Sequence, residues 1–282
     1  MINLPTKNRL KKGVVRRAKI LQTTLSMPHK LLYVYGILSL KSLHLPDFLI
    51  IGTPKAGTTW LKKNLDCHPD LFLPETNLNN TTEVRYFNQK FNKSLQWYSD
   101  LFLPGKDKIK GEKTPSYCVL PKKRIQFIHS IMPKVKVIFL MRNPIERDWS
   151  HAVMNLIKFD KKHLEQIPKE KFIFHFNLNE RFSNYLNIIN NWRSFFPENQ
   201  LFTGCFDDIH RHPKQLLIDI FNFLNVSSSI NLSTFPYRKK INKNPKIQIP
   251  DFYKNYLKNK YALQIQKLAT IYSNTISEWN NI

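Results

Sequence analysis

The sequence predicts a three-layer α/β domain of the P-loop type, in which helices flank a central, mainly parallel sheet. Three observations predict this fold. Strand-like segments alternate with helix-like segments from about residue 47 onward, as in βαβ units. Residues 46–52 and 135–141 contain near-continuous apolar runs, which are typical of strands buried on both faces. The first of these runs leads through a glycine-containing loop into a helix-like segment, and this order creates an anion site.

The remaining elements follow the same alternation along the chain. We expect strands at residues 71–74, 108–113 and 201–206, with residues 108–113 as an edge strand that runs into a turn. Glu83 would begin a further apolar and aromatic strand after a polar loop. Helical spacing of apolar residues predicts helices that start near Thr58 and Pro144 and helices at residues 95–102, 124–132, 181–196, 213–226 and 251–270. Residues 158–171 form a charged stretch between two of these helices.

Length and charge distribution predict one large domain with an extension. The 282 residues, of which 42% are hydrophobic, can supply a sizeable core. We expect residues 47–282 to form the domain, and residues 1–46 to form a basic N-terminal extension, because these contain lysines and arginines but no acid. The apolar run at residues 31–40 is about half of the ~20 residues that a membrane-spanning helix needs. The extension would therefore either contact an anionic membrane surface or pack on the domain.

Cysteine usage indicates the compartment. The three cysteines are an odd number without close spacing, which predicts a reducing environment and no disulfide framework. We therefore expect a cytoplasmic protein, with membrane association through residues 1–46 as a further expectation.

The loop at residues 50–61, IIGTPKAGTTWL, differs from a nucleoside triphosphate loop at one informative position. In the GxxxxGK[ST] pattern a lysine follows the second glycine, but here Thr58 follows Gly57, and Lys55 lies earlier in the loop. A helix N-terminus with inward-pointing N–H groups still favours an anion. We expect the phosphate to be bound by residues Lys55, Ala56, Gly57, Thr58 and Thr59.

Arg142 predicts a second anion site and argues against a metal. It ends the strand-like run at residues 135–141, where an NTPase would place an acid that holds Mg²⁺. A cation there repels a metal ion and attracts another phosphate, and Ser150 in the following helix could add a hydroxyl donor. Two separate anionic groups without a metal do not suit ATP hydrolysis, so a nucleotide kinase or NTPase with a degenerate loop becomes the alternative reading.

These segments resemble those of sulfotransferases that use 3′-phosphoadenosine 5′-phosphosulfate (PAPS). FLIIGTPKAGTTWL and VIFLMRNPIERDWSHAV are similar to the paired 5′- and 3′-phosphate signatures of that family. EVRYFN, GEKTPSY and YRKK follow in the same order as in the heparan sulfate N- and 3-O-sulfotransferases and their bacterial relatives. The resemblance spans residues 47–245 and implies PAPS as the co-substrate, with no metal.

The resemblance also implies catalytic roles. Glu83 would be the general base for the acceptor, with Glu75 and Glu112 as competing acids. Lys55 and Lys113 would stabilise the charge that develops on the leaving phosphate.

Further residues would bind the co-substrate by the same resemblance. Arg142 and Ser150 match the residues that hold the 3′-phosphate. Arg238, Lys239 and Lys240 match a loop that folds over the cofactor. Which of these three contacts phosphate stays open.

The acceptor is only partly constrained. A formal net charge of +24 favours anionic partners, nucleic acid among them. Because no helix has a dense basic stripe and no aromatic–basic sheet motif is present, a basic nucleic-acid-binding protein is the alternative that we rank below the NTPase. Residues 85–88 read Arg-Tyr-Phe-Asn where the heparan sulfate enzymes have His-Phe-Phe-Asp, so a polysaccharide substrate cannot be inherited. We expect transfer to a hydroxyl or amine of a carbohydrate or other small acceptor, and Arg85 would suit an acidic one.

Overall fold

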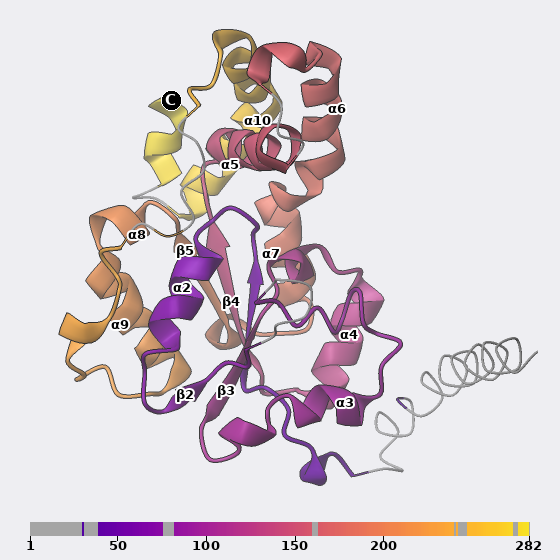
Figure 1. The fold of residues 1–282 in the computed structure, drawn as a ribbon, viewed down its shortest axis with the longest axis vertical. Helices are drawn as coiled ribbons and strands as arrows, with labels where there is room; N and C mark the ends of the chain where they lie inside the picture. Colours follow the sequence, from indigo (N-terminus) through magenta and orange to yellow (C-terminus); the bar gives the residue numbers. More distant parts are fainter. Residues whose placement is uncertain are drawn as a thin grey trace, which may run out of the picture.

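A five-stranded parallel sheet lies at the centre of the protein (Figure 1). The computed structural model describes residues 30, 39–75, 82–159, 163–239, 241, 247–272 and 276–281. The strands are β1 (Phe48–Gly52), β2 (Leu71–Phe72), β3 (Ile109–Lys113), β4 (Lys136–Met141) and β5 (Leu201–Cys205). Their order is β2-β3-β1-β4-β5, and every neighbouring pair is parallel. The predicted mainly parallel sheet is therefore confirmed.

Helices cover both faces of the sheet, as three layers require. On one face lie α2 (Thr58–Leu65), α8 (Asp208–Arg211) and α9 (Pro213–Leu224). On the other lie α3 (Leu95–Asp100), α4 (Lys122–Ile131) and α7 (Tyr185–Arg193). The helices α5 (Pro144–Ala152), α6 (Lys169–Asn179) and α10 (Asp251–Ile271) gather near the carboxyl ends of β4 and β5 (Figure 1).

The apolar run of β1 explains why it lies in the middle of the sheet. All five of its residues are buried, and successive side chains point to opposite faces of a strand. Leu49 and Ile51 pack into the core under α4 and α7. Phe48 and Ile50 pack into the core under α2 and α9. Burial on both faces fixes the carboxyl end of β1, and with it the position of the loop that follows.

Two sequence predictions near β3 are wrong. β3 pairs with both β1 and β2, so it is an interior strand; the two-residue strand β2 is the edge that the sequence assigned to residues 108–113. The segment after Glu83 forms a turn instead of a strand. Arg85 has a positive φ of 58°, and its carbonyl accepts hydrogen bonds from the N–H groups of Gln89 and Lys90, both at 3.0 Å.

The sequence analysis missed α6. Lys169–Lys171 look like part of a charged stretch, but they form the solvated first turn of this helix. The buried residues Phe172, His175, Phe176 and Asn179 then follow at the three- and four-residue spacing of one helix face. The predicted helix at residues 181–196 is correspondingly shorter and begins at Tyr185.

The N-terminal extension is described only in part. Leu40, Leu43 and Leu45 pack against the core, whereas the predicted membrane contact falls mainly on residues outside those described. Within the described helices, none combines the length and the apolar character needed to cross a membrane. All three cysteines, Cys67, Cys118 and Cys205, are free thiols in this structure.

Candidate functional site

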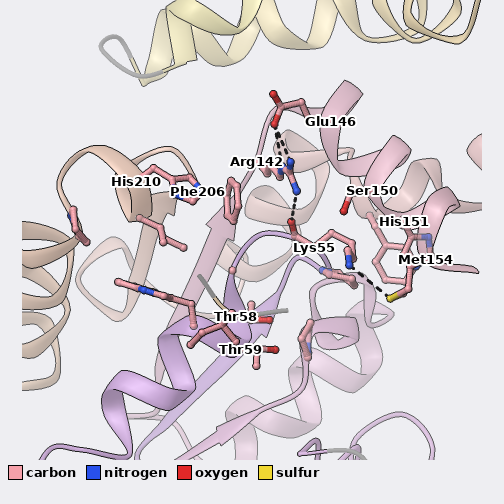
Figure 2. A pocket seen from close by; sticks show the side chains of 18 of the residues that line it. Lys55, Thr58, Thr59, Arg142, Glu146, Ser150, His151, Met154, Phe206 and His210 are labelled. Carbon is pink, nitrogen blue, oxygen red and sulfur yellow. Dashed lines mark hydrogen bonds and ion pairs between the residues drawn. The ribbon is translucent and has the colours of Figure 1, made fainter. Parts of the chain in front are cut away.

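A cavity of about 1850 Å³ lies at the carboxyl ends of the central strands. Lys55 follows β1, Arg142 follows β4 and Phe206 follows β5, and all three line this cavity (Figure 2). In an open parallel sheet, ligands bind in the crevice outside the carboxyl ends of the strands. The cavity therefore occupies the position that the topology predicts for a ligand site.

The loop after β1 leaves space for an anion at the start of α2. Gly57 is the N-cap residue, with a φ of 83°, and a Cβ atom there would lie 2.2 Å from Ile209 Cδ1. Glycine is therefore required both by its left-handed backbone and by the close approach of α8. In the described chain no side chain caps the first turn of α2, and that turn contains no acid. The N–H groups of such a turn attract a negatively charged ligand.

Side chains of the same loop point into the cavity. Lys55 also has a left-handed backbone, with a φ of 73°, and its Nζ lies 3.7 Å from Met154 Sδ. Thr58 and Thr59 line the cavity wall below Lys55 (Figure 2). Ala56 is fully buried in the core and is not a lining residue, so its side chain has a packing role.

Arg142 connects the two predicted anion sites. Its guanidinium donates to the Lys55 carbonyl at 3.2 Å and to Glu146 Oε2 at 3.0 and 3.2 Å (Figure 2). The same group lies 4.4 Å from the ring centroid of Phe206. Ser150, two turns along α5, lines the same cavity. Lys55 and Arg142, 87 residues apart in sequence, thus lie on one wall.

Glu83 lines the cavity together with Arg85. The Arg85 Nε atom donates to Glu83 Oε2 at 2.7 Å, and the Glu83 side chain keeps 22% of its exposure. Glu75 is exposed and is not a lining residue. Glu112 is fully buried, and burial raises the pKa of its carboxyl to about 7. Of the three acids considered from the sequence, Glu83 is therefore the one that faces the cavity.

Lys113 lies behind this wall instead of on it. It is 4% exposed, and its Nζ donates to Thr82 Oγ1 at 2.8 Å, beside Glu83. Burial lowers the pKa of the Lys113 ammonium. Lys113 is absent from the residues that line the cavity in the described part of the chain, so its contact in this structure is with the segment that contains Glu83.

The basic segment between Tyr237 and Ile247 also contributes to the cavity. Arg238 and Lys239 line it, and Lys240 lies outside the described residues. Two buried indoles hold the flanks of this segment. Trp60 Nε1 donates to the Tyr237 carbonyl at 2.9 Å, and Trp149 Nε1 donates to the Ile247 carbonyl at 2.8 Å.

Several lining residues were not predicted. They include Trp60, Trp149, His151, Met154 and Phe206. Phe206 directly follows β5, so its position at a strand end beside β4 was a usable signal. His151 Nδ1 lies 3.1 Å from His175 Nε2, a contact that depends on the undetected helix α6. Burial lowers the pKa of His151 to about 2, so its ring is neutral at physiological pH.

A family model described as "Sulfotransferase domain" matches residues 45–281 of the chain. The membrane-associated sulfotransferase kil1 of Dictyostelium discoideum is 32% identical over 127 residues, which cover 43% of this chain and 26% of that protein. The human heparan sulfate glucosamine 3-O-sulfotransferase 6 is 34% identical over 114 residues, covering 40% and 31%. The chain thus spans less than a third of the length of these relatives.

Solved structures agree on the fold. A sulfotransferase from Alicyclobacillus acidocaldarius superimposes with a TM-score of 0.64 and 20% identity, over 83% of this chain and 98% of that one. A mouse sulfotransferase, SULT7A1, complexed with PAP, has a TM-score of 0.50 and 14% identity, over 86% and 92%. The family match supports neither an NTPase nor a nucleic-acid-binding protein.

Proposed function

The chain belongs to the sulfotransferase family, and on this premise we propose that it transfers a sulfuryl group from PAPS to a hydroxyl or amine of a glycan or other small acceptor. One observation supports this proposal above the others. The uncapped start of α2 with Lys55, the guanidinium of Arg142 and the carboxylate of Glu83 all face one cavity. Cationic groups for the phosphates and one acid for the acceptor proton are what a transfer from a bisphosphorylated nucleotide to a hydroxyl or amine needs.

The charged and polar residues that line the cavity suit the phosphates of PAPS. The N–H groups and hydroxyls of Thr58 and Thr59 at the start of α2 would bind the 5′-phosphate. Arg142 and Ser150 would bind the 3′-phosphate, since an arginine fork binds phosphate bidentately. Arg238 and Lys239 add positive charge to the lining of the cavity.

The residues of this chain divide the chemistry between them. When bound, PAPS supplies an activated sulfuryl group on a good leaving phosphate. Lys55 would stabilise the negative charge that develops as the phosphate leaves, and its left-handed backbone directs the side chain from within the loop into the cavity. Glu83 would accept the proton of the attacking group. The positive charge of Lys113, whose Nζ donates to Thr82 Oγ1, would help to stabilise the negative charge of the leaving phosphate without direct contact.

The wall beside Glu83 supports a proposal for the class of acceptor. Arg85 lines the cavity beside this acid, so an acceptor that approaches Glu83 also meets a guanidinium. An anionic glycan or another small acidic acceptor would pair with this group. Relatives named for heparan sulfate sulfation are compatible with such a substrate.

We also infer a cytoplasmic location, because a protein with three free thiols suits a reducing compartment. Contact of residues 1–46 with an anionic membrane stays a proposal, and a membrane-associated relative is compatible with it.

Transfer of labelled sulfate from PAPS tests the function. The purified protein is incubated with PAPS, without Mg²⁺, and with a panel of glycans, lipids and phenols. We expect labelled product with at least one acceptor, and a drop of about 100-fold or more in turnover for Lys55→Ala, since removal of one stabilising group for transition-state charge costs about 10²–10³-fold. Labelled product formed equally by Lys55→Ala would contradict the role of Lys55, and no transfer to any acceptor would contradict the proposed activity.

A further inference from the structure

Hydroxyl groups from the end of β3 hold the turn next to Glu83. The backbone N–H of Arg85 donates to Thr114 Oγ1 at 3.0 Å. Two residues on, the N–H of Phe87 donates to the hydroxyl of Tyr117 at 2.9 Å. Both acceptors lie in the short segment that continues from β3 into the helical turn η4 (Pro115–Val119).

The same two hydroxyls both donate to Glu112. Thr114 Oγ1 donates to Glu112 Oε1 at 2.9 Å, and the Tyr117 hydroxyl donates to the same oxygen at 2.6 Å. The second carboxylate oxygen, Oε2, accepts a hydrogen bond from the hydroxyl of Tyr98. Glu112, Thr114, Tyr117 and Tyr98 are all fully buried, so water does not compete for these contacts.

The directions of the hydrogen bonds made by Thr114 and Tyr117 are determined. A backbone N–H can only donate, so each hydroxyl must accept from the turn. Each hydroxyl has one proton, which must then point to another acceptor. A carboxylate oxygen with two lone pairs can receive both protons, and Glu112 Oε1 does so. Glu112 therefore orients Thr114 and Tyr117 as acceptors for the N–H groups of Arg85 and Phe87.

The network leads directly to the acid at the cavity. Arg85, whose N–H is held by Thr114, donates through its Nε to Glu83 Oε2 at 2.7 Å. The bond from Thr114 holds the backbone of Arg85 in place, and the Arg85 side chain in turn orients the Glu83 carboxylate. Glu112 itself does not line the cavity, so it cannot act on a substrate directly.

We propose that Glu112 is a positioning residue for the sulfuryl transfer, acting through the Thr114 and Tyr117 hydroxyls to hold the turn that places Glu83 at the cavity. This inference rests on the proposed function for its catalytic consequence. The positioning of the turn is a property of the folded protein and can be measured without any substrate.

Two buried tyrosines provide a matched test. Tyr117→Phe and Tyr98→Phe each remove one hydroxyl that donates to Glu112. Only Tyr117 also accepts from the turn, at Phe87. Each variant therefore removes one hydrogen bond to the Glu112 carboxylate, but only Tyr117→Phe also removes the hydrogen bond that holds the N–H of Phe87 in the turn.

We expect Tyr117→Phe to raise amide hydrogen exchange at Phe87 by about tenfold or more, because its N–H loses a buried acceptor. The same variant should lower kcat about tenfold while the affinity for 3′-phosphoadenosine 5′-phosphate stays within about twofold of wild type. Tyr98→Phe should leave the Phe87 exchange rate and kcat within about twofold of wild type. Equal effects of the two variants, or none from Tyr117→Phe, would overturn the proposal.

A second variant keeps the test decisive if Tyr117→Phe does not fold. Thr114→Val removes the other connecting hydroxyl, and Thr114→Ser restores it. We expect faster exchange at the Arg85 amide in the valine variant and rescue in the serine variant; failure of serine to rescue would overturn the proposal. If the wild-type protein transfers no sulfate to any acceptor, the proposed function fails, whereas the exchange rates at Arg85 and Phe87 still decide whether Glu112 holds the turn.

Discussion

The two sides of the cavity are built in different ways. The side that we propose binds phosphate, called here the phosphate-facing side, is a loop between β1 and α2, whose glycines, left-handed Lys55 and uncapped helix start lie within ten residues of sequence. The acid-bearing side is a turn at residues 82–88 that is held by side chains of β3 and η4 from about 30 residues away. The first side is specified by local backbone conformation and the second by long-range buried hydrogen bonds. Binding and turnover should therefore respond separately to changes on the two sides.

Removing the acid should give the largest effect. Glu83→Gln keeps the size and the hydrogen-bonding reach of the side chain, but it removes the proton acceptor. We expect turnover in labelled-sulfate transfer to fall by about 10²–10⁴-fold, with calorimetric affinity for 3′-phosphoadenosine 5′-phosphate within about twofold of wild type. Glu75 is an exposed acid that does not line the cavity, so Glu75→Gln is the control. Its turnover and nucleotide affinity should equal those of wild type. A Glu83→Gln enzyme with wild-type turnover would mean that another group is the base.

The buried carboxyl behind the turn should make stability depend on pH. Burial raises the pKa of Glu112 in the folded protein from 4.5 to about 7. This rise is the net result, because four smaller effects lower the pKa: the hydrogen bonds from Tyr117, Tyr98 and Thr114 and the charge of Lys90. The folded state then binds the proton more tightly than the unfolded state, so this stabilisation is complete below about pH 4.5 and is lost as the pH rises to about 7. Relative to Glu112→Gln, the wild-type free energy of unfolding should fall by up to about 3 kcal/mol over this range.

Chemical denaturation at several pH values between 4 and 8 measures this difference. Since the other titrating groups are the same in both proteins, they cancel in the comparison. Parallel pH profiles for wild type and Glu112→Gln would contradict the assignment of this titration to Glu112.

A change on the phosphate side should separate binding from turnover in the opposite sense. Arg142→Ala removes a charged fork, and hydrogen bonds to charged groups contribute about 1.5–3 kcal/mol. We expect the Kd for 3′-phosphoadenosine 5′-phosphate to rise about 10- to 100-fold, with little change for 5′-AMP, which lacks the 3′-phosphate. The Kd of Arg142→Lys for 3′-phosphoadenosine 5′-phosphate should lie between those of wild type and Arg142→Ala, because lysine keeps the charge but lacks the planar guanidinium fork. Equal weakening of both nucleotides would place Arg142 away from the 3′-phosphate.

The smallest effect should come from the segment that contains Arg238. Trp60→Phe removes the indole N–H that donates to the Tyr237 carbonyl at 2.9 Å. We expect nucleotide affinity to fall by about two- to tenfold, because a neutral hydrogen bond contributes about 0.5–1.5 kcal/mol. Trp192→Phe is the control, since its buried indole donates to the Cys118 carbonyl at 3.3 Å and does not line the cavity. Similar losses of affinity in both variants would indicate general destabilisation.

The phosphate-facing side could be predicted from sequence because its determinants are local. The buried run of β1, the glycine at residue 57 and the start of a helix at Thr58 follow one another directly. Arg142 could be predicted because it ends the other strongly apolar strand, and carboxyl ends of neighbouring parallel strands meet at one edge. Local pattern and topology rules together were sufficient for these positions.

The acid-bearing side could not be predicted in the same way. The segment Glu83–Asn88 has strand-like composition, and its turn depends on Thr114 and Tyr117, whose partners no periodicity identifies. The interior place of β3 was missed because β2, its outer neighbour, has only two residues. Likewise α6 was missed because its charged first turn hides the apolar spacing that follows.

Calorimetric titration of the wild-type protein with 3′-phosphoadenosine 5′-phosphate and with ADP, both without Mg²⁺, tests the central claim most directly. A cavity that is lined by Lys55, the start of α2 and Arg142 should bind the bisphosphorylated nucleotide at least about tenfold more tightly, since one well-placed charged contact contributes about 1.4 kcal/mol or more. Equal affinity for ADP, or binding that requires Mg²⁺, would contradict the account.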